Sequence, residues 1–236
     1  MKKILIFSII LFLSLFINSC AIQTKIIKSL QTARDSILKI ETWASLGECN
    51  NETMTCGEYN LYSTASGAII LYKNKKAILT AAHVCKQVNF ELFVATRNGD
   101  FHLKAVDRND KEYIIEIIKY NIHGDICLLR SVSGELESDY IPISTKRPEY
   151  AEKSYNLAAP MGIINRDMVP ILHGHYFGTL NNDAYYSIPA IGGSSGSPIL
   201  NSKGELIGMI HSVHAKFHHI SLSTTYVQLW NFLKVN

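Results

Sequence analysis

The chain lacks the features that mark several large classes of protein. Only 18% of its 236 residues are charged and the formal net charge is +3, so no basic surface points to nucleic acid as a partner. It has no low-complexity tract and no internal repeat. Hydrophobic residues make up 47% of the chain, so a disordered chain is not expected. We therefore expect one globular unit, or two small lobes that share a cleft, around a substantial core.

The sequence also lacks an apolar run long enough to cross a membrane comfortably. The longest run covers residues 4–17, whereas a spanning helix needs ~20 residues. Two lysines precede this run and a short polar segment ending in Ser19 follows it, which is the order of an export signal. We predict a signal peptide at residues 1–19, with a permanent membrane anchor as the alternative. Loss of this segment lowers the formal net charge to +1.

Cys20 directly follows the predicted signal peptide. The segment INSC that ends in Cys20 resembles a bacterial lipobox, although Asn18 stands where a small or hydroxylated residue is usual. The resemblance implies that Cys20 becomes the amino terminus and carries a lipid. Residues 20–36 are then a lipid-anchored tether, and the protein is a membrane-anchored lipoprotein of the bacterial cell envelope. Ordinary cleavage near Ser19 followed by secretion is the alternative.

Cysteine is scarce, with five residues in the chain. If Cys20 carries a lipid, Cys49, Cys56, Cys85 and Cys127 remain. An even number in an exported chain favours disulfides, and four cysteines allow three pairings. We favour a Cys49–Cys56 bridge that closes a small polar loop. Reduced, buried thiols are the alternative.

Short apolar runs separated by polar turns dominate the chain from residue 36 onward. Many short strands at fairly regular spacing favour closed or sandwiched antiparallel sheets. Residues 225–235 instead have apolar side chains near helical spacing and predict a terminal helix that packs on the body. The predicted strands cover residues 36–43, 66–72, 76–80, 90–96, 101–108, 112–118, 126–132, 153–158, 169–177, 184–189, 198–201, 205–212 and 220–225.

Three short segments contain side chains that could act together in catalysis. The first is LTAAHVC with His83, the second is HGDICLL with Asp125, and the third is GGSSGSP with Ser195. Each is weak alone, because a histidine at a strand end, an aspartate before a strand or a Gly/Ser turn is commonly structural. Their joint occurrence in this order, at separations that leave room for several strands, is specific.

This order of segments resembles the chymotrypsin-like (trypsin-like) serine peptidases over about residues 37–230. The resemblance implies an all-β fold of two six-stranded antiparallel barrels followed by a helix. The first barrel would cover about residues 37–140 and the second about residues 141–224. It also implies a serine endopeptidase that acts on polypeptides and needs no cofactor.

The resemblance assigns a catalytic triad to His83, Asp125 and Ser195. A serine hydroxyl is a poor nucleophile at neutral pH, so Ser195 needs His83 as a base within hydrogen-bond reach. A buried Asp125 carboxylate would fix the tautomer of His83 and stabilise its protonated form. The backbone N–H groups of Gly193 and Ser195 would form the oxyanion hole.

Two residues beside the nucleophile depart from the digestive branch of this family. Ser194 stands where trypsin-like zymogens have an aspartate, so activation by a new amino-terminal salt bridge is not expected. Ser197 replaces the commoner glycine and gives SGSP, which resembles the bacterial glutamyl endopeptidases. The later segment GELIG resembles both these enzymes and the HtrA-type peptidases. We expect no separate peptide-binding (PDZ) domain.

The substrate pocket is predicted at Pro189, Ala190 and Ile210. In the glutamyl branch, a threonine and a histidine at the last two positions bind the substrate carboxylate, and neither is present here. His211 lies one residue further, and a shift of one residue on a strand turns a side chain to the other face. We therefore predict a small or apolar side chain on the acyl side of the cleaved bond.

The triad also suggests the second disulfide. Cys85 lies two residues after His83, and Cys127 lies two residues after Asp125. Because His83 and Asp125 must touch, the two cysteines should be close, and a bridge between them would brace the pair. It requires a Cα separation of about 4.4–6.8 Å.

The sequence also bears on three other interpretations. The nine histidines match no structural zinc spacing, so no metal is predicted. An α/β-hydrolase is disfavoured because GSSGS lacks the final glycine of its nucleophile motif and leads into a strand. A catalytically inactive binding module with the peptidase fold is the main alternative.

Overall fold

The computed structural model describes residues 23–45, 57–97 and 99–234. The predicted signal peptide, the lipidation site and the Cys49–Cys56 bridge lie outside the described residues. Within the described ranges, no helix is both long enough and apolar enough to span a membrane.

The first half of the chain forms a closed antiparallel barrel with the strand order β1-β2-β3-β6-β5-β4. Strand β4 closes the barrel by pairing with β1. Fully buried aliphatic side chains such as Ile40, Ile78 and Leu128 fill its interior. Its strands are β1 (Ile37–Ser45), β2 (Asn60–Tyr72), β3 (Lys75–Thr80), β4 (Asp100–Val106), β5 (Glu112–Asn121) and β6 (Ile126–Ser131).

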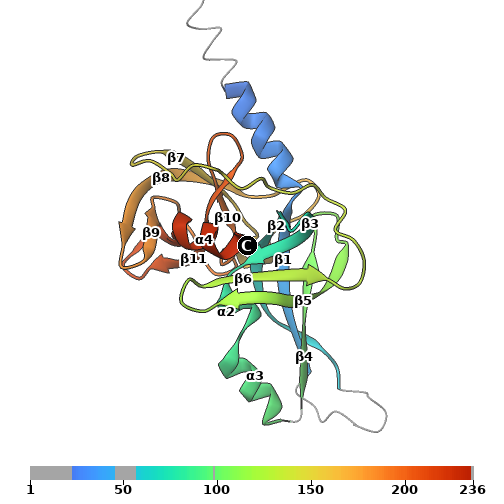
Figure 1. The fold of residues 1–236 in the computed structure, drawn as a ribbon. Coiled ribbons are helices and arrows are strands. Elements are labelled where there is room, and N and C mark those ends of the chain that lie inside the picture. The colour runs from blue at the N-terminus through green and yellow to red at the C-terminus, as the bar shows by residue number, and fades with distance from the viewer. Residues whose placement is uncertain (1–22, 46–56, 98, 235–236) are drawn as a thin grey trace, which may run out of the picture.

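The second half forms another closed antiparallel barrel, with the order β10-β11-β12-β9-β8-β7. The two barrels lie side by side (Figure 1). The fold is therefore the predicted pair of six-stranded antiparallel barrels. The strands of the second barrel are β7 (Lys153–Leu157), β8 (Ile171–Leu180), β9 (Asp183–Tyr186), β10 (Pro198–Leu200), β11 (Leu206–His214) and β12 (Phe217–Thr224).

Two tight hairpins show how local sequence sets strand register. The β2–β3 turn is Lys73-Asn74 and the β8–β9 turn is Asn181-Asn182, and all four residues have positive φ between 49° and 69°. Two-residue turns with this backbone match the twist of paired strands, and asparagine tolerates the left-handed region well. Each hairpin therefore brings the residues flanking its turn into register.

The predicted strand at residues 90–96 is wrong. This segment is a helix, α3 (Val88–Ala95), which lies outside the first barrel at the end opposite the amino-terminal helix (Figure 1). Its aromatic and aliphatic content is typical of a strand, but Phe90 and Val94 lie four residues apart and share one helical face. Both are buried against Ala44 and Phe101, so packing against the barrel decides the structure.

Helices frame the barrels at both ends of the chain. The helix of residues 23–34 projects from the barrels, with Leu30 and Ala33 buried against the core (Figure 1). The predicted carboxy-terminal helix is α4 (Tyr226–Leu233), and Thr225 and Gln228 form a capping box at its start. Two shorter elements complete the fold: α2 (Ala82–Cys85) and the 3-10 helix η1 (Pro160–Gly162).

Candidate active site

The residues predicted as a triad lie in loops and a short helix at strand ends. His83 lies in α2, directly after β3, and Asp125 lies in the turn before β6. The two segments meet because β3 pairs with β6, with Thr80 opposite Cys127. Ser195 lies between β9 and β10 of the second barrel. The candidate site therefore draws on both barrels.

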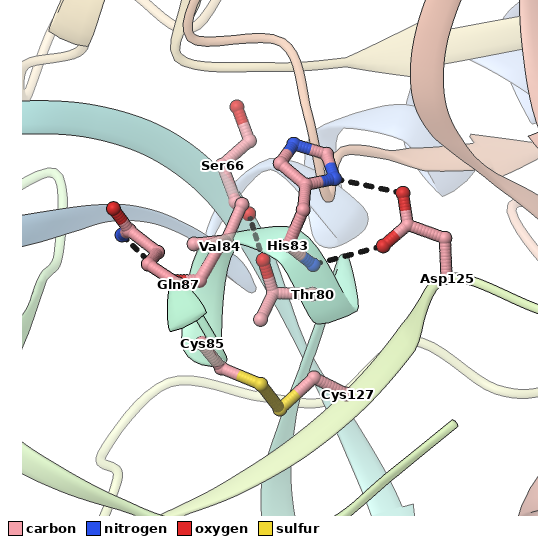
Figure 2. The surroundings of a disulfide bond; sticks show 8 residues. All are labelled: Ser66, Thr80, His83, Val84, Cys85, Gln87, Asp125 and Cys127. Carbon is pink, nitrogen blue, oxygen red and sulfur yellow. Dashed lines mark hydrogen bonds and ion pairs between the residues drawn. A yellow bond between two sulfur atoms is a disulfide. The ribbon is translucent and has the colours of Figure 1, made fainter. Parts of the chain in front are cut away.

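His83 and Asp125 are joined by two hydrogen bonds, shown in Figure 2. The His83 ring nitrogen Nδ1 lies 2.7 Å from Asp125 Oδ2, and the His83 backbone N–H donates to Asp125 Oδ1 at 2.9 Å. A carboxylate only accepts, so Nδ1 carries the proton of the first bond. The second ring nitrogen, Nε2, is then left with its lone pair, as a general base requires.

The Asp125 carboxyl is mostly buried, and two effects act on its pKa in opposite directions. Burial raises the pKa, because it penalises the charged form. The hydrogen bonds from His83, together with the positive charge that His83 and His211 can carry, lower it. The lowering effects win, and the pKa of Asp125 lies below its usual value. The carboxyl is therefore ionised when it faces the ring.

A disulfide lies beneath this pair (Figure 2). It joins Cys85 to Cys127 with a Cα separation of 6.5 Å, and both residues are buried. One cysteine is in the helix that carries His83, and the other is near the start of the strand that follows Asp125. The bridge ties the two segments together, as the sequence predicts.

Ser66, a fully buried serine of β2, contacts the loop of residues 192–197 in the other barrel. We call this segment the nucleophile loop, because it contains the predicted nucleophile Ser195. Its N–H donates to the carbonyl of Ser195 at 2.8 Å, and its hydroxyl donates to the carbonyl of Gly193 at 2.7 Å. The same hydroxyl accepts from the N–H of Ala159, and the Ser66 carbonyl accepts from Thr80 Oγ1, both at 2.8 Å. Two of these four bonds hold the loop directly, and the other two tie Ser66 itself to Ala159 and Thr80.

Two amide donors in the nucleophile loop are free. The carbonyl preceding Gly193 accepts from the Met161 N–H at 2.8 Å, and the carbonyl preceding Ser195 accepts from the Ser197 N–H at 3.1 Å. In a planar trans peptide the N–H points opposite to the C=O. The N–H groups of Gly193 and Ser195 therefore face away from those partners. Neither donates to an acceptor in the described part of the chain, so both can meet an oxyanion.

Glycine is required at two positions of this loop. Gly193 and Gly196 have φ of +88° and +87°, in the region that favours glycine. A Cβ on Gly193 would lie 2.3 Å from the Met161 nitrogen, and one on Gly196 would lie 2.1 Å from the Ser66 carbonyl oxygen. A larger residue at position 193 would therefore clash with the segment at the start of η1, and one at position 196 would clash with the first barrel.

Ser195 and His83 are not joined by a hydrogen bond among the described contacts. Ser195 Oγ instead donates to the carbonyl of His211 at 3.4 Å. In enzymes without substrate, such catalytic bonds are often long or poorly aligned and tighten in the complex. The structure thus brings His83 and Asp125 into contact and leaves Ser195 Oγ bonded elsewhere.

Comparison with known proteins assigns the family. The model of the trypsin-like peptidase domain matches residues 65–209, more than half of the chain. This chain belongs to that family. The matched range includes His83, Asp125 and Ser195.

One solved structure is similar to this peptidase domain over most of its length: the crystal structure of the serine endoprotease from Yersinia pestis. The TM-score is 0.65 at 14% sequence identity. The match covers 87% of this chain and 64% of the other, so this chain spans less than two thirds of the length of that endoprotease. At this identity the likeness shows the fold.

The residues predicted to line the substrate pocket lie in the second barrel of the peptidase domain. Ala190 and Ile210 are buried in its core, in a cluster with Tyr186 and Ile188, and Pro189 is partly exposed. Neither Ala190 nor Ile210 carries a charged or polar side chain. Their role in substrate selection stays a prediction.

Ser194 and Ser197, the two residues that depart from the digestive branch, both make hydrogen bonds within the second barrel. Ser194 is buried, and its hydroxyl accepts from the Ile191 N–H at 3.3 Å, which closes the turn before Ser195. Ser197 is also buried and accepts from the Asn156 side-chain amide at 2.8 Å. Each serine thus stabilises the loop through a local bond.

Two residues of the site make contacts that the sequence did not predict. Ser66 stands at the start of a predicted strand and matches no motif. The one available signal is its place beside an apolar run, because a buried serine needs a hydrogen-bond partner. His211 is predicted only to face away from the pocket. In the structure, its ring lies between the carboxylates of Asp125 and Asp183. Among the described residues, no three His, Cys, Asp or Glu side chains are grouped to hold a metal.

Proposed function

We propose that this protein is a serine endopeptidase in which Ser195 is the nucleophile, His83 the general base and Asp125 the residue that orients His83. One observation carries the proposal: both oxygens of Asp125 accept hydrogen bonds from His83, one from the ring and one from the backbone. This arrangement leaves Nε2 of His83 as an acceptor on the side away from Asp125.

The reaction follows from these positions. Ser195 Oγ attacks the carbonyl carbon of a peptide bond as its proton passes to His83 Nε2, and the carbonyl oxygen becomes an oxyanion. The free N–H groups of Gly193 and Ser195 donate to that oxyanion, and loss of one such donor typically costs ~3–4 kcal/mol of transition-state stabilisation. His83 then gives its proton to the leaving amine, and an acyl-enzyme remains on Ser195.

Hydrolysis of the acyl-enzyme completes the cycle. A water molecule attacks the ester carbonyl while His83 Nε2 takes its proton. The proton returns to Ser195 Oγ as the ester bond breaks and the carboxylic acid leaves. No cofactor enters either half of the reaction.

An organofluorophosphonate separates this function from an inactive binding module. We expect one adduct per molecule, on Ser195, because only an activated serine hydroxyl displaces the fluoride. Intact-mass and peptide mass spectrometry measure the adduct and its position. The denatured protein is the control and should not react. A native protein that stays unlabelled would favour the binding module.

We further propose export and a lipid anchor at Cys20. The order of residues 1–19 and the lipobox-like INSC segment support this location. The helix of residues 23–34 begins shortly after Cys20 in the sequence and projects from the barrels (Figure 1). It therefore offers a spacer between an anchor and the peptidase domain.

Replacing Cys20 tests the anchor in bacterial cells. Cys20→Ser should move the protein from the membrane fraction to the soluble envelope or the medium, because the acceptor of the lipid is lost. Cell fractionation and immunoblotting measure the shift, with Ser19→Ala as the neighbouring control. Membrane retention of Cys20→Ser would contradict the lipid anchor and favour the permanent apolar anchor.

A further inference from the structure

His211 lies where the second barrel meets the turn that carries Asp125, and we call this place the junction. A triad of His83, Asp125 and Ser195 does not by itself require a histidine there. The His211 ring is largely buried, with 14% of the side chain exposed, and it sits between two carboxylates. Nδ1 faces Asp125 Oδ2 at 4.0 Å, and Nε2 lies 3.2 Å from Asp183 Oδ1. At 4.0 Å the first contact is too long for a hydrogen bond and is an ion pair only when the ring is protonated, whereas the second is within the range of a hydrogen bond.

Strand register builds this junction. His211 lies on β11, and Asp183 is the first residue of β9. Strand β12 lies between them, pairing Ser223 with Ile210 on one side and Thr224 with Asp183 on the other. The two side chains therefore meet across the neighbouring strand, at the end of the sheet that faces Asp125.

The same junction also contacts Ser195 and the turn that precedes β6. The main-chain oxygen of His211 accepts from Ser195 Oγ at 3.4 Å. Beside it, Thr224 Oγ1 donates to the carbonyl of Gly124 at 2.8 Å, in a fully buried bond. The second barrel thus holds the turn that carries Asp125, a residue whose φ of +47° lies in the strained left-handed region.

We infer that His211, held by Asp183, is a positioning residue of the peptidase reaction that keeps the Asp125 carboxylate aimed at His83. This inference rests on the proposed function.

The physical argument concerns the charge and the rotation of the Asp125 carboxylate. Oδ2 accepts from His83 and still has a lone pair to place. When both ring nitrogens of His211 are protonated, the Nδ1–H faces Oδ2 and opposes rotation of the carboxylate away from His83. A ring with no second partner could turn. Asp183 accepts at Nε2 and so fixes the ring orientation, as outer carboxylates do for other functional histidines.

Asp183 has a second effect on the same group. When His211 carries both protons, its positive charge would compete with protonated His83 for the charge of Asp125. The Asp183 carboxylate, 3.2 Å from the ring, offsets this charge. The negative charge of Asp125 then remains available to stabilise His83 when it is protonated in the transition state.

A double-mutant cycle on the full chain tests the inference. His211→Ala should lower kcat about tenfold with little change in KM, because the contact matters when His83 is protonated and not when substrate binds. Asp183→Asn should lower kcat to a smaller extent in the wild-type background. It should have no effect in the His211→Ala background, because Asp183 acts through His211.

Two conservative variants distinguish a positioning role from a purely structural one, because only a positioning role predicts that they differ in kcat. Asn at position 211 places an amide nitrogen near the site of Nδ1, and Gln places one near the site of Nε2. His211→Asn should recover most of the lost kcat, and His211→Gln should recover less. His173→Ala removes an exposed histidine of the same barrel, whose ring contacts Tyr155, and serves as the matched control.

The outcomes separate this inference from the proposed function. A wild-type protein that hydrolyses no peptide overturns the proposed function itself. Active wild type with unchanged kcat in His211→Ala, even with a lower melting temperature, overturns only the role of His211. Additive losses in the double variant overturn the link through Asp183.

Discussion

Ser195→Ala is expected to lower kcat about 10⁶-fold, because the base and the oxyanion donors act as a unit with the nucleophile. The fold should survive. Ser195 Oγ makes one long bond, to the carbonyl of His211, whereas the loop is held by the backbone bonds of Ser66 and Gly196. Hydrolysis of a peptide library measures turnover, and the thermal midpoint measures stability.

The neighbouring serine supplies the matched control. Ser194→Ala removes a buried hydroxyl that accepts one backbone bond, so it should cost about 1 kcal/mol of stability and leave kcat within tenfold of wild type. Turnover that survives in Ser195→Ala, or that is lost only in Ser194→Ala, would contradict the assignment of the nucleophile.

Asp125→Asn is expected to lower kcat about 10⁴-fold while leaving substrate binding nearly intact. The reason is the tautomer of His83. The carboxylate accepts from both the ring and the backbone of His83, whereas an amide can accept only through its oxygen and presents its NH₂ group to the other partner. An amide facing Nδ1 favours the proton on Nε2, where it blocks the base.

The lowered pKa of Asp125 should also make the stability of the protein depend on pH. The pKa of Asp125 is lower in the folded protein than in the unfolded chain, so its ionised form adds stability above the unfolded pKa. That contribution is lost as the pH falls toward the folded value. The stability gap between wild type and Asp125→Asn should therefore shrink below about pH 4. Thermal melts across pH measure it, and a gap that widens on acidification would contradict the lowered pKa.

Much of the fold could be predicted because the relevant signals are local. Alternating apolar runs and turns indicated the strands of both barrels, and helical spacing indicated α4. Helix α3 was missed because its composition is typical of a strand and only burial of Phe90 and Val94 on the barrel settles its conformation. Tertiary packing overrides propensity in such short segments.

In the candidate site, too, the contacts set by local motifs could be predicted and those set by distant strands could not. The placement of His83 beside Asp125, and of Cys85 beside Cys127, could be predicted from two short motifs, because a catalytic histidine and aspartate must touch; in the structure the pairing of β3 with β6 brings them together. The contacts of His211 depend on the register of three strands of the second barrel and on a turn of the first. No short stretch of sequence contains that information.

The hydrogen bonds from Ser66 to the nucleophile loop also have a consequence for the chain while it folds. Because Ser66 belongs to the first barrel and its partners Gly193 and Ser195 belong to the second, the loop is held only after the two barrels dock. A chain with one barrel still unfolded would lack either the proposed base His83 or an ordered Ser195. Under the proposed function, copies that have not finished folding should therefore not digest one another.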